Sequence, residues 1–152
     1  MAILINGSNF LDGLNGLLTG YYIITLISII FLVNFYPGID PIDYNFVTTL
    51  IFVLFIFFIF NIFGLVYLGD SGTYLLSLLI GVYLIKFNYN NDFLSPYYIA
   101  VLLWYPAFEN FFSLFRRYFK KQKTSSPDNL HLHHMIFLFL QNKKFFSKKI
   151  IN

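Results

Sequence analysis

The chain contains no cysteine, which excludes disulfides and thiolate metal ligands. Charged residues are also scarce: only 11% of the 152 residues are Asp, Glu, Lys or Arg, whereas 58% are hydrophobic. A soluble domain of this length could not bury so much apolar surface, because a small domain leaves a large share of its surface in water. No segment alternates apolar and polar residues with period two, as the strands of a transmembrane barrel do. The composition therefore predicts an all-α integral membrane protein.

Four apolar segments are long enough to cross a membrane, at about residues 17–35, 46–63, 73–89 and 97–115. The third reaches Tyr89 only if the Lys86 side chain extends to the interface. Pro106 lies inside the fourth segment and predicts a kink or break there, because proline removes a backbone donor. We expect a polytopic transmembrane helical bundle that comprises residues 1–152 as one domain.

Basic residues lie almost entirely at one end of the chain, since nine of the ten Lys and Arg follow residue 115. Basic residues next to spans favour the cytoplasmic side of a membrane, so we expect residues 116–152 to be cytoplasmic. Counting back across four spans places residues 1–16 and 61–72 on the same side. The net charge of +3 fits this topology and an anionic inner leaflet, and gives no reason to expect nucleic-acid binding.

Polar residues gather in three clusters, all on the predicted cytoplasmic face. The first cluster, residues 6–17, includes Asn6, Asn9 and Asp12, whose spacing of three puts them near one face of a helix. Its glycines would let the backbone turn and a ligand approach closely. A polar helix end with ordinary caps would explain the same residues.

The second cluster, residues 61–73, joins the second span to the third and contains Gly69, Asp70, Ser71 and Gly72. A helix N-terminus at this point suits a phosphate, and Asp70 suits Mg²⁺, which takes one or two carboxylates plus substrate phosphates. The alternative is an ordinary N-cap by Asp70 or Ser71. That alternative does not explain the glycines on both sides of Asp70.

The third cluster consists of His131, His133 and His134 in the basic C-terminal segment. The spacing matches no zinc finger or zincin pattern, and no thiol is available. Binding of an anionic phosphate by these histidines, with Arg116 and Arg117, suits the residue types better. A patch that contacts lipid headgroups is the alternative.

Glu109 is an acid inside the fourth span, where an ionisable group is a candidate for a functional role. Arg116 and Arg117 lie close enough in sequence to neutralise it, so structural pairing stays open as well. A transporter with a polar path through Asp12, Asp70 and Glu109 is a further alternative. Transport sites usually lie near the bilayer midplane, however, whereas these clusters lie at the ends of spans. Their residue types suit phosphoryl transfer, which depends on positioning and charge neutralisation.

Together the three clusters resemble those of the polyprenyl-phosphate N-acetylhexosamine-1-phosphate transferases (glycosyltransferase family 4), which include phospho-N-acetylmuramoyl-pentapeptide transferase. The matching residues, in order, are Asn6-x-x-Asn9-x-x-Asp12-Gly13-x-Asn15-Gly16-Leu17, Gly69-Asp70-Ser71-Gly72 and His131-x-His133-His134. The resemblance implies transfer of a sugar 1-phosphate from a UDP-N-acetylhexosamine to undecaprenyl or another polyprenyl phosphate, with release of UMP. It also implies a role in cell-envelope polysaccharide synthesis, such as cell wall or lipopolysaccharide, at the cytoplasmic face of the bacterial inner membrane.

The same resemblance implies roles for individual residues. Asp70 and Asn9 would hold Mg²⁺, for which Mn²⁺ is an alternative, and the kinked fourth span would open a groove for the lipid. The implied catalytic residues are Asp12, Asp70, His131, His133 and His134. The implied substrate-binding residues are Asn6, Asn9, Asn15, Gly69, Ser71, Arg116 and Arg117.

The chain departs from the family pattern in two ways. Asn15 stands where many members have Asp, which bears on nucleotide contacts and leaves the sugar open. The family also has an Asp-Asp motif and several further spans before the first cluster, so the chain resembles only the C-terminal part. The expected partners therefore include a missing N-terminal half or a homodimer partner, besides the UDP-sugar and the membrane lipid. An inactive fragment or a non-enzymatic membrane subunit is the alternative function.

Overall fold

The computed structural model describes residues 1–39, 43–119, 132, 135, 136, 138 and 139. Every regular element within these residues is a helix, which confirms the predicted all-α class. The helices are α1 (Ala2–Leu11), α2 (Leu17–Phe35), α3 (Tyr44–Ile62), α4 (Gly69–Tyr89), α5 (Pro96–Leu102) and α6 (Trp104–Phe119).

Within the described residues, three helices are long and apolar enough to cross a membrane: α2, α3 and α4, with 19, 19 and 21 residues. The pair α5 and α6 forms a fourth candidate span that is bent by 66°. The chain is therefore a multi-pass membrane protein. The predicted bounds of the first, second and fourth spans agree with α2, α3 and the α5–α6 pair to within a few residues. The third span, α4, begins four residues earlier than expected.

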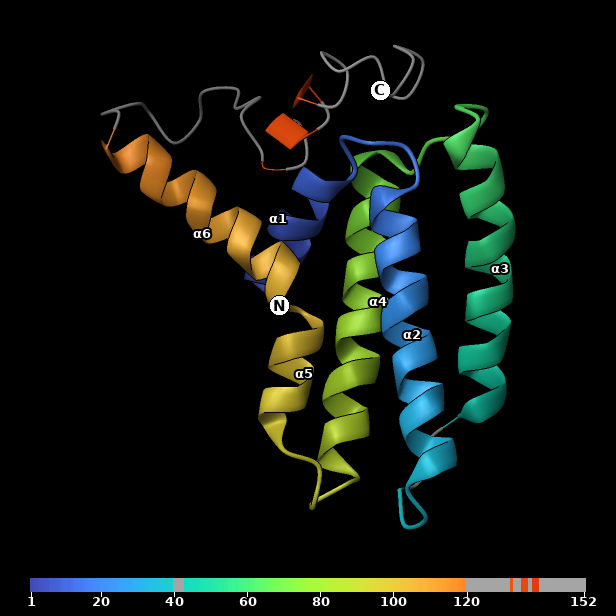
Figure 1. Cartoon of the computed structure of the whole chain (residues 1–152). Coiled ribbons are helices and arrows are strands. Elements are labelled where there is room, and N and C mark those ends of the chain that lie inside the picture. The colour runs from blue at the N-terminus through green and yellow to red at the C-terminus, as the bar shows by residue number, and fades with distance from the viewer. Residues whose placement is uncertain (40–42, 120–131, 133–134, 137, 140–152) are drawn as a thin grey trace.

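The long helices lie side by side, and their connections gather at the two ends of the bundle (Figure 1). The connections from α1 to α2 and from α3 to α4 lie at one end, shown at the top. Those from α2 to α3 and from α4 to α5 lie at the other. The first and second clusters therefore share one end, as the count of spans predicts.

The short helix α1 is built into the bundle by contacts with α6 and α4. Ser8 on α1 and Tyr22 on α2 are both fully buried, and their hydroxyl oxygens are 2.6 Å apart in a hydrogen bond. Gly7 lies against the backbone of α6, because a Cβ atom added there would be 2.0 Å from the Pro106 carbonyl oxygen. A small residue thus lets two backbones touch, as is common between membrane helices. These contacts fix the C-terminal half of α1, from which the chain continues into the rest of the first cluster.

The break in the fourth span lies at Leu103, between α5 and α6, rather than at Pro106 itself. Proline has no N–H, so Pro106 cannot bond the carbonyl of Leu102, four residues earlier. The Tyr21 hydroxyl of α2 donates a hydrogen bond to that carbonyl instead. The predicted break is confirmed, and its position follows from the carbonyl that the proline leaves free.

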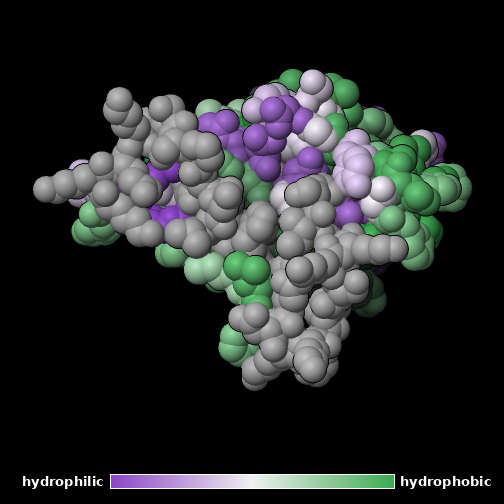
Figure 2. Space-filling model, turned by 90° about the horizontal axis from the view of Figure 1, so that it is seen from above, coloured by the Kyte–Doolittle hydropathy of each residue, from purple (hydrophilic) through white to green (hydrophobic). Residues whose placement is uncertain are grey.

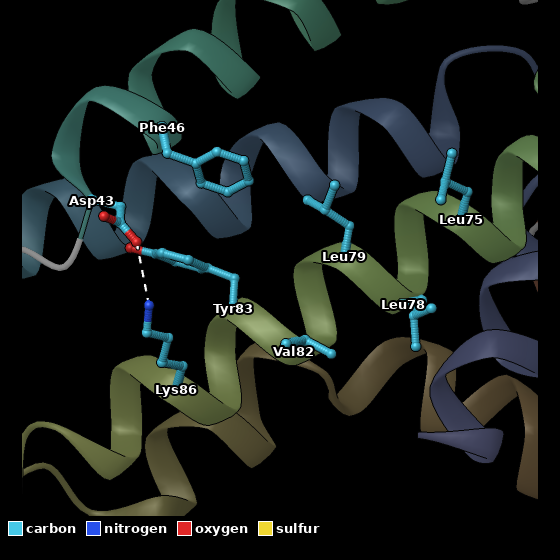
Figure 3. Close-up of a pocket in the computed structure, with 8 residues that line it drawn as sticks. All are labelled: Asp43, Phe46, Leu75, Leu78, Leu79, Val82, Tyr83 and Lys86. Atoms are coloured by element: carbon cyan, nitrogen blue, oxygen red, sulfur yellow. Dashed lines mark hydrogen bonds and ion pairs between the residues drawn. The ribbon is translucent and has the colours of Figure 1, made fainter.

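An apolar groove runs along α4 where α3 stands away from it (Figure 3). Its volume is about 380 Å³, and Phe46, Leu79 and Tyr83 are among the side chains that line it. The Lys86 Nζ atom lies 3.5 Å from the Asp43 carboxylate at its polar end, and both side chains are more than half exposed. Lys86 and Asp43 belong to the end of the bundle opposite the two clusters, so the groove's polar end is not part of the site described next.

Candidate functional site

Asp12 and Asp70 bring the first and second clusters together. Asp12 caps the C-terminus of α1, where its backbone N–H donates to the Ser8 carbonyl at 3.2 Å. Its carboxylate faces the N-terminus of α4, where it accepts a hydrogen bond from the Gly69 N–H and lies near Asp70 and Thr73. The Asp12 side chain thus lies against the first turn of α4, close enough to Asp70 for the two charges to interact, although the two residues are far apart in sequence.

Gly69, Asp70, Ser71 and Gly72 of the second cluster form the first turn of α4, and this contradicts the alternative in which Asp70 or Ser71 is the N-cap. The N-cap residue is Leu68, so neither Asp70 nor Ser71 is the N-cap. Gly69 has a φ of +62°, a conformation open to glycine, and so turns the chain from the preceding loop into the helix. Asp70 and Ser71 are exposed in the first turn, where a helix attracts negative charge.

Burial raises the pKa of the Asp12 carboxyl above its ordinary value of 3.8. The Thr73 hydroxyl and the Gly69 N–H, which face the carboxyl, lower the pKa, and the neighbouring charge of Asp70 raises it. The net direction is upward, because loss of water and a second carboxylate both disfavour the charged form. A cation between the two carboxylates would reverse this balance.

One buried polar atom in the loop after Asp12, Asn15 Oδ1, has no hydrogen bond within the described part of the chain. An unpaired buried polar atom is costly, and a bound ion or ligand is one explanation for it. Carboxylate, amide and hydroxyl oxygens are hard donors that suit Mg²⁺. Among the described residues no three acids or histidines come together as a metal site. The donor types that are present suit Mg²⁺, which usually takes one or two carboxylates plus substrate phosphates.

Figure 2 looks down on this end of the bundle and shows hydrophilic residues gathered there among hydrophobic ones. Asn6 is exposed and Asn9 is half-buried on α1, which is helical as the spacing of the first cluster requires. Asp70 and Ser71 are exposed on α4. Asn6, Asp70 and Ser71 are thus the polar residues of these clusters that are most open to a ligand from outside.

Residues 1–88 match the sequence model of the family described as Glycosyl transferase family 4. The chain belongs to glycosyl transferase family 4. The match covers both clusters that meet at Asp12 and Asp70, and it confirms the resemblance drawn from the motifs.

Curated relatives in the family are polyprenyl-phosphate sugar transferases by name. The chain is 28% identical to a probable undecaprenyl-phosphate N-acetylglucosaminyl 1-phosphate transferase of Bacillus subtilis (strain 168), over 88% of this chain and 37% of the relative. It is 30% identical to an undecaprenyl-phosphate alpha-N-acetylglucosaminyl 1-phosphate transferase of Thermotoga maritima, over 87% of this chain and 39% of the relative. A decaprenyl-phosphate N-acetylglucosaminephosphotransferase of Mycolicibacterium smegmatis is 28% identical, with coverage of 88% and 37%. The chain thus spans less than two fifths of these relatives' length. No solved structure matches it.

The described structure of this family 4 chain does not place the predicted arginines or the third cluster beside Asp12. Arg116 and Arg117 lie in the last turn of α6, which runs away from the N-terminus of α4 (Figure 1). The Arg116 guanidinium lies 5.4 Å from the centre of the Phe112 ring. The assignment of both arginines to the substrate stays a prediction. The third cluster, His131, His133 and His134, lies outside the described residues.

Asn61 is a residue whose role sequence reasoning missed, although it lies within the second cluster. It is buried at the end of α3, where its Oδ1 accepts a hydrogen bond from the Gly16 N–H at 2.7 Å. Its Nδ2 donates to the Val66 carbonyl at 2.8 Å. One side chain therefore ties the loop after Asp12 to the loop before Asp70. The signal in the sequence was an amide at the end of an apolar helix, next to a glycine-containing loop.

Proposed function

We propose that the chain forms part of the active site of an enzyme that transfers an N-acetylhexosamine 1-phosphate from a UDP-sugar to undecaprenyl or a related polyprenyl phosphate, with release of UMP. The observation that carries the proposal is the approach of Asp12 to the first turn of α4, which contains Asp70, at one end of a membrane bundle. Membership of glycosyl transferase family 4 and the names of the relatives support this reaction.

The residues of the site have two proposed roles, which are binding of a metal ion and binding of a phosphate. Asp70 and Asn9, with Asp12 beside them, would hold Mg²⁺ or Mn²⁺. A divalent ion, when bound, neutralises charge on a diphosphate. The first turn of α4 presents backbone N–H groups that favour a phosphate, and Ser71 is exposed there. Phosphoryl transfer requires positioning and charge stabilisation more than covalent chemistry from the protein. These residues therefore suit the donor diphosphate.

The location of the site supports a membrane-bound acceptor. The site lies at the end of apolar helices, where a lipid phosphate at the membrane surface can reach it. We propose that this end faces the cytoplasm of a bacterium at its inner membrane, because nine of the ten basic residues follow residue 115. The product would then be a lipid-linked sugar for cell-envelope polysaccharide. Because the chain spans less than two fifths of its relatives, we propose that further chain, from an N-terminal half or a second copy, completes the pocket.

The test is release of UMP from UDP-N-acetylglucosamine with undecaprenyl phosphate and Mg²⁺. The 152-residue chain alone should be inactive or nearly so, whereas the chain co-expressed with the N-terminal portion of a relative should turn over. Asp70→Ala should abolish that turnover. The matched control is Asp92→Asn, which removes an exposed carboxylate at the opposite end of the bundle. Turnover that survives Asp70→Ala would overturn the role of Asp70, and no UMP from either preparation would overturn the reaction.

A further inference from the structure

Four buried hydroxyl groups lie on three different helices, next to the site at Asp12. They belong to Ser8 of α1, Tyr22 of α2, and Thr73 and Ser77 of α4, and all four residues are fully buried. A buried hydroxyl is costly unless it is hydrogen-bonded. Between membrane helices, serine and threonine side chains commonly meet this need by bonding across the helix interface. The four hydroxyl groups therefore tie α1, α2 and α4 together beside Asp12.

The number of protons fixes the direction of each bond among these groups. The Ser77 hydroxyl donates its one proton to the Thr73 main-chain carbonyl at 2.5 Å. The Ser77 oxygen therefore accepts from the neighbouring Tyr22 hydroxyl, which uses the Tyr22 proton. Tyr22 in turn accepts from the Ser8 hydroxyl, 2.6 Å away. Through a single hydroxyl group, Tyr22 thus joins α1 to α4.

Both ends of this chain of bonds lead to Asp12. On α1, the Asp12 backbone N–H donates to the Ser8 carbonyl at 3.2 Å. On α4, the Thr73 hydroxyl faces the Asp12 carboxyl. From Tyr22, one path therefore runs through Ser8 to the main chain of Asp12, and the other runs through α4 to its carboxyl. The contacts form a closed ring, so that a shift of α1 against α4 would move Asp12 relative to the first turn of α4.

We propose that Tyr22 is a positioning residue that fixes the Asp12 carboxylate against the first turn of α4. Tyr22 lies in α2, outside the three polar clusters. The consequence for turnover rests on the proposed function, whereas the position of Asp12 does not. Tyr22→Phe removes the hydroxyl and keeps the ring, so it breaks the link between α1 and α4 while the apolar packing of the ring is retained.

Hydrogen exchange at the Gly69 amide, measured by NMR on the full chain in detergent micelles, reports whether the Asp12 carboxylate is in place. The first N–H groups of a helix have no partner within the helix, and the Gly69 N–H donates to the Asp12 carboxylate instead. Asp12→Ala removes this acceptor and so gives the exchange rate of the free amide. Exchange in the wild type should be slower than in Asp12→Ala by roughly tenfold, which corresponds to about 1.4 kcal/mol. Exchange in Tyr22→Phe should be faster than in the wild type by roughly three- to tenfold.

Tyr98→Phe is the matched control. The Tyr98 and Ser28 hydroxyl oxygens are 2.8 Å apart in a hydrogen bond between α5 and α2, and α5 lies in the half of the bundle away from the site (Figure 1). This variant loses the same kind of tyrosine–serine bond, so a general loss of stability would change Gly69 exchange in both variants alike. Exchange at Gly69 in Tyr98→Phe should equal that in the wild type. Equal rates in Tyr22→Phe and the wild type, or equal acceleration in the two phenylalanine variants, would overturn the proposal.

Ser77→Ala breaks the same path on α4 and decides the question if Tyr22→Phe does not fold. It should also speed exchange at Gly69, and an unchanged rate would overturn the proposal. Equal exchange at Gly69 in the wild type and in Asp12→Ala would overturn it as well, because the carboxylate would then not be held at α4.

Turnover gives a separate test of the consequence for catalysis. In a preparation that releases UMP, Tyr22→Phe should lower kcat, whereas Tyr98→Phe should leave it unchanged. Faster Gly69 exchange with an unchanged kcat would overturn the consequence for turnover. If no preparation releases UMP, the proposed function fails, and the exchange rates at Gly69 still decide whether Tyr22 positions Asp12.

Discussion

Replacing Gly7 by alanine should drive α1 and α6 apart, and the structure allows the size of the effect to be worked out. The added Cβ would lie 2.0 Å from the Pro106 carbonyl oxygen and 2.5 Å from its carbonyl carbon. Ordinary van der Waals contact begins at 3.4 Å, so the backbones must separate by roughly 1.4 Å. The obstacle is backbone rather than the end of a flexible side chain, which means that no rotamer change can relieve it.

The expected loss of stability follows from two opposed effects. Overpacking of a well-packed contact costs typically about 1–3 kcal/mol, and a backbone clash of this depth belongs at the upper end. Alanine is the better helix former and returns up to about 1 kcal/mol. The net expectation is a loss of about 2 kcal/mol in the free energy of unfolding, measured by circular dichroism as SDS is titrated into micelles of a mild detergent.

Gly20→Ala is the matched control for this experiment. Gly20 is also helical, but the nearest atoms to its added Cβ would belong to the Phe58 ring, with Cε2 at 3.0 Å. That atom belongs to a ring that can rotate, so the variant gains helix propensity at little steric cost. Its free energy of unfolding should stay within about 1 kcal/mol of the wild type. Equal stabilities for Gly7→Ala and Gly20→Ala would refute the close contact between α1 and α6.

Two further predictions concern the loops of the site. Asn61→Ala should lower the free energy of unfolding by about 1–3 kcal/mol, because the buried Gly16 N–H loses its acceptor. The control is Asn34→Ala, which changes an exposed asparagine, and an equal effect of both variants would contradict the role of Asn61. Asp12→Asn should stabilise the chain at neutral pH, because the folded-state pKa of the Asp12 carboxyl is raised and ionisation therefore opposes folding. The gain in stability of Asp12→Asn should shrink as the pH falls through the folded-state pKa toward 3.8, because the wild-type carboxyl then becomes neutral. If the difference in unfolding free energy between Asp12→Asn and the wild type does not change with pH, the pKa is not raised.

The spans could be predicted because their signals are local. Gly16 stands directly before α2 and Pro37 follows its end, so the local sequence alone predicted both ends of that helix. The shared end of the first two clusters followed from the number of crossings. The start of α4 could not be predicted in the same way. Two glycines near Asp70 suggested a loop, whereas Gly69 uses its positive φ to begin the helix there.

Other features escaped prediction because they depend on residues far apart in sequence. The break itself was predicted from Pro106, but its position at Leu103 also depends on Tyr21, whose hydroxyl donates a hydrogen bond to the free carbonyl of Leu102. The link through Asn61 joins residues that are 45 positions apart. No periodicity or motif encodes such a pair, since each partner is an ordinary residue in its own segment. Tertiary contacts decide these details, and the polar groups of the site depend on several of them.

The arrangement of acids in the site also bears on how a ligand would bind. The described residues bring only two carboxylates together, and the pKa of one is raised by burial and by the charge of the other. These two carboxylates alone would not complete the coordination of a divalent ion, because Mg²⁺ requires an octahedral set of oxygens. A donor diphosphate can supply oxygens, and it also needs a cation to offset its own charge. Under the proposed function the ion and the UDP-sugar should therefore bind together, each completing the site for the other, and Asp12 should ionise when they do.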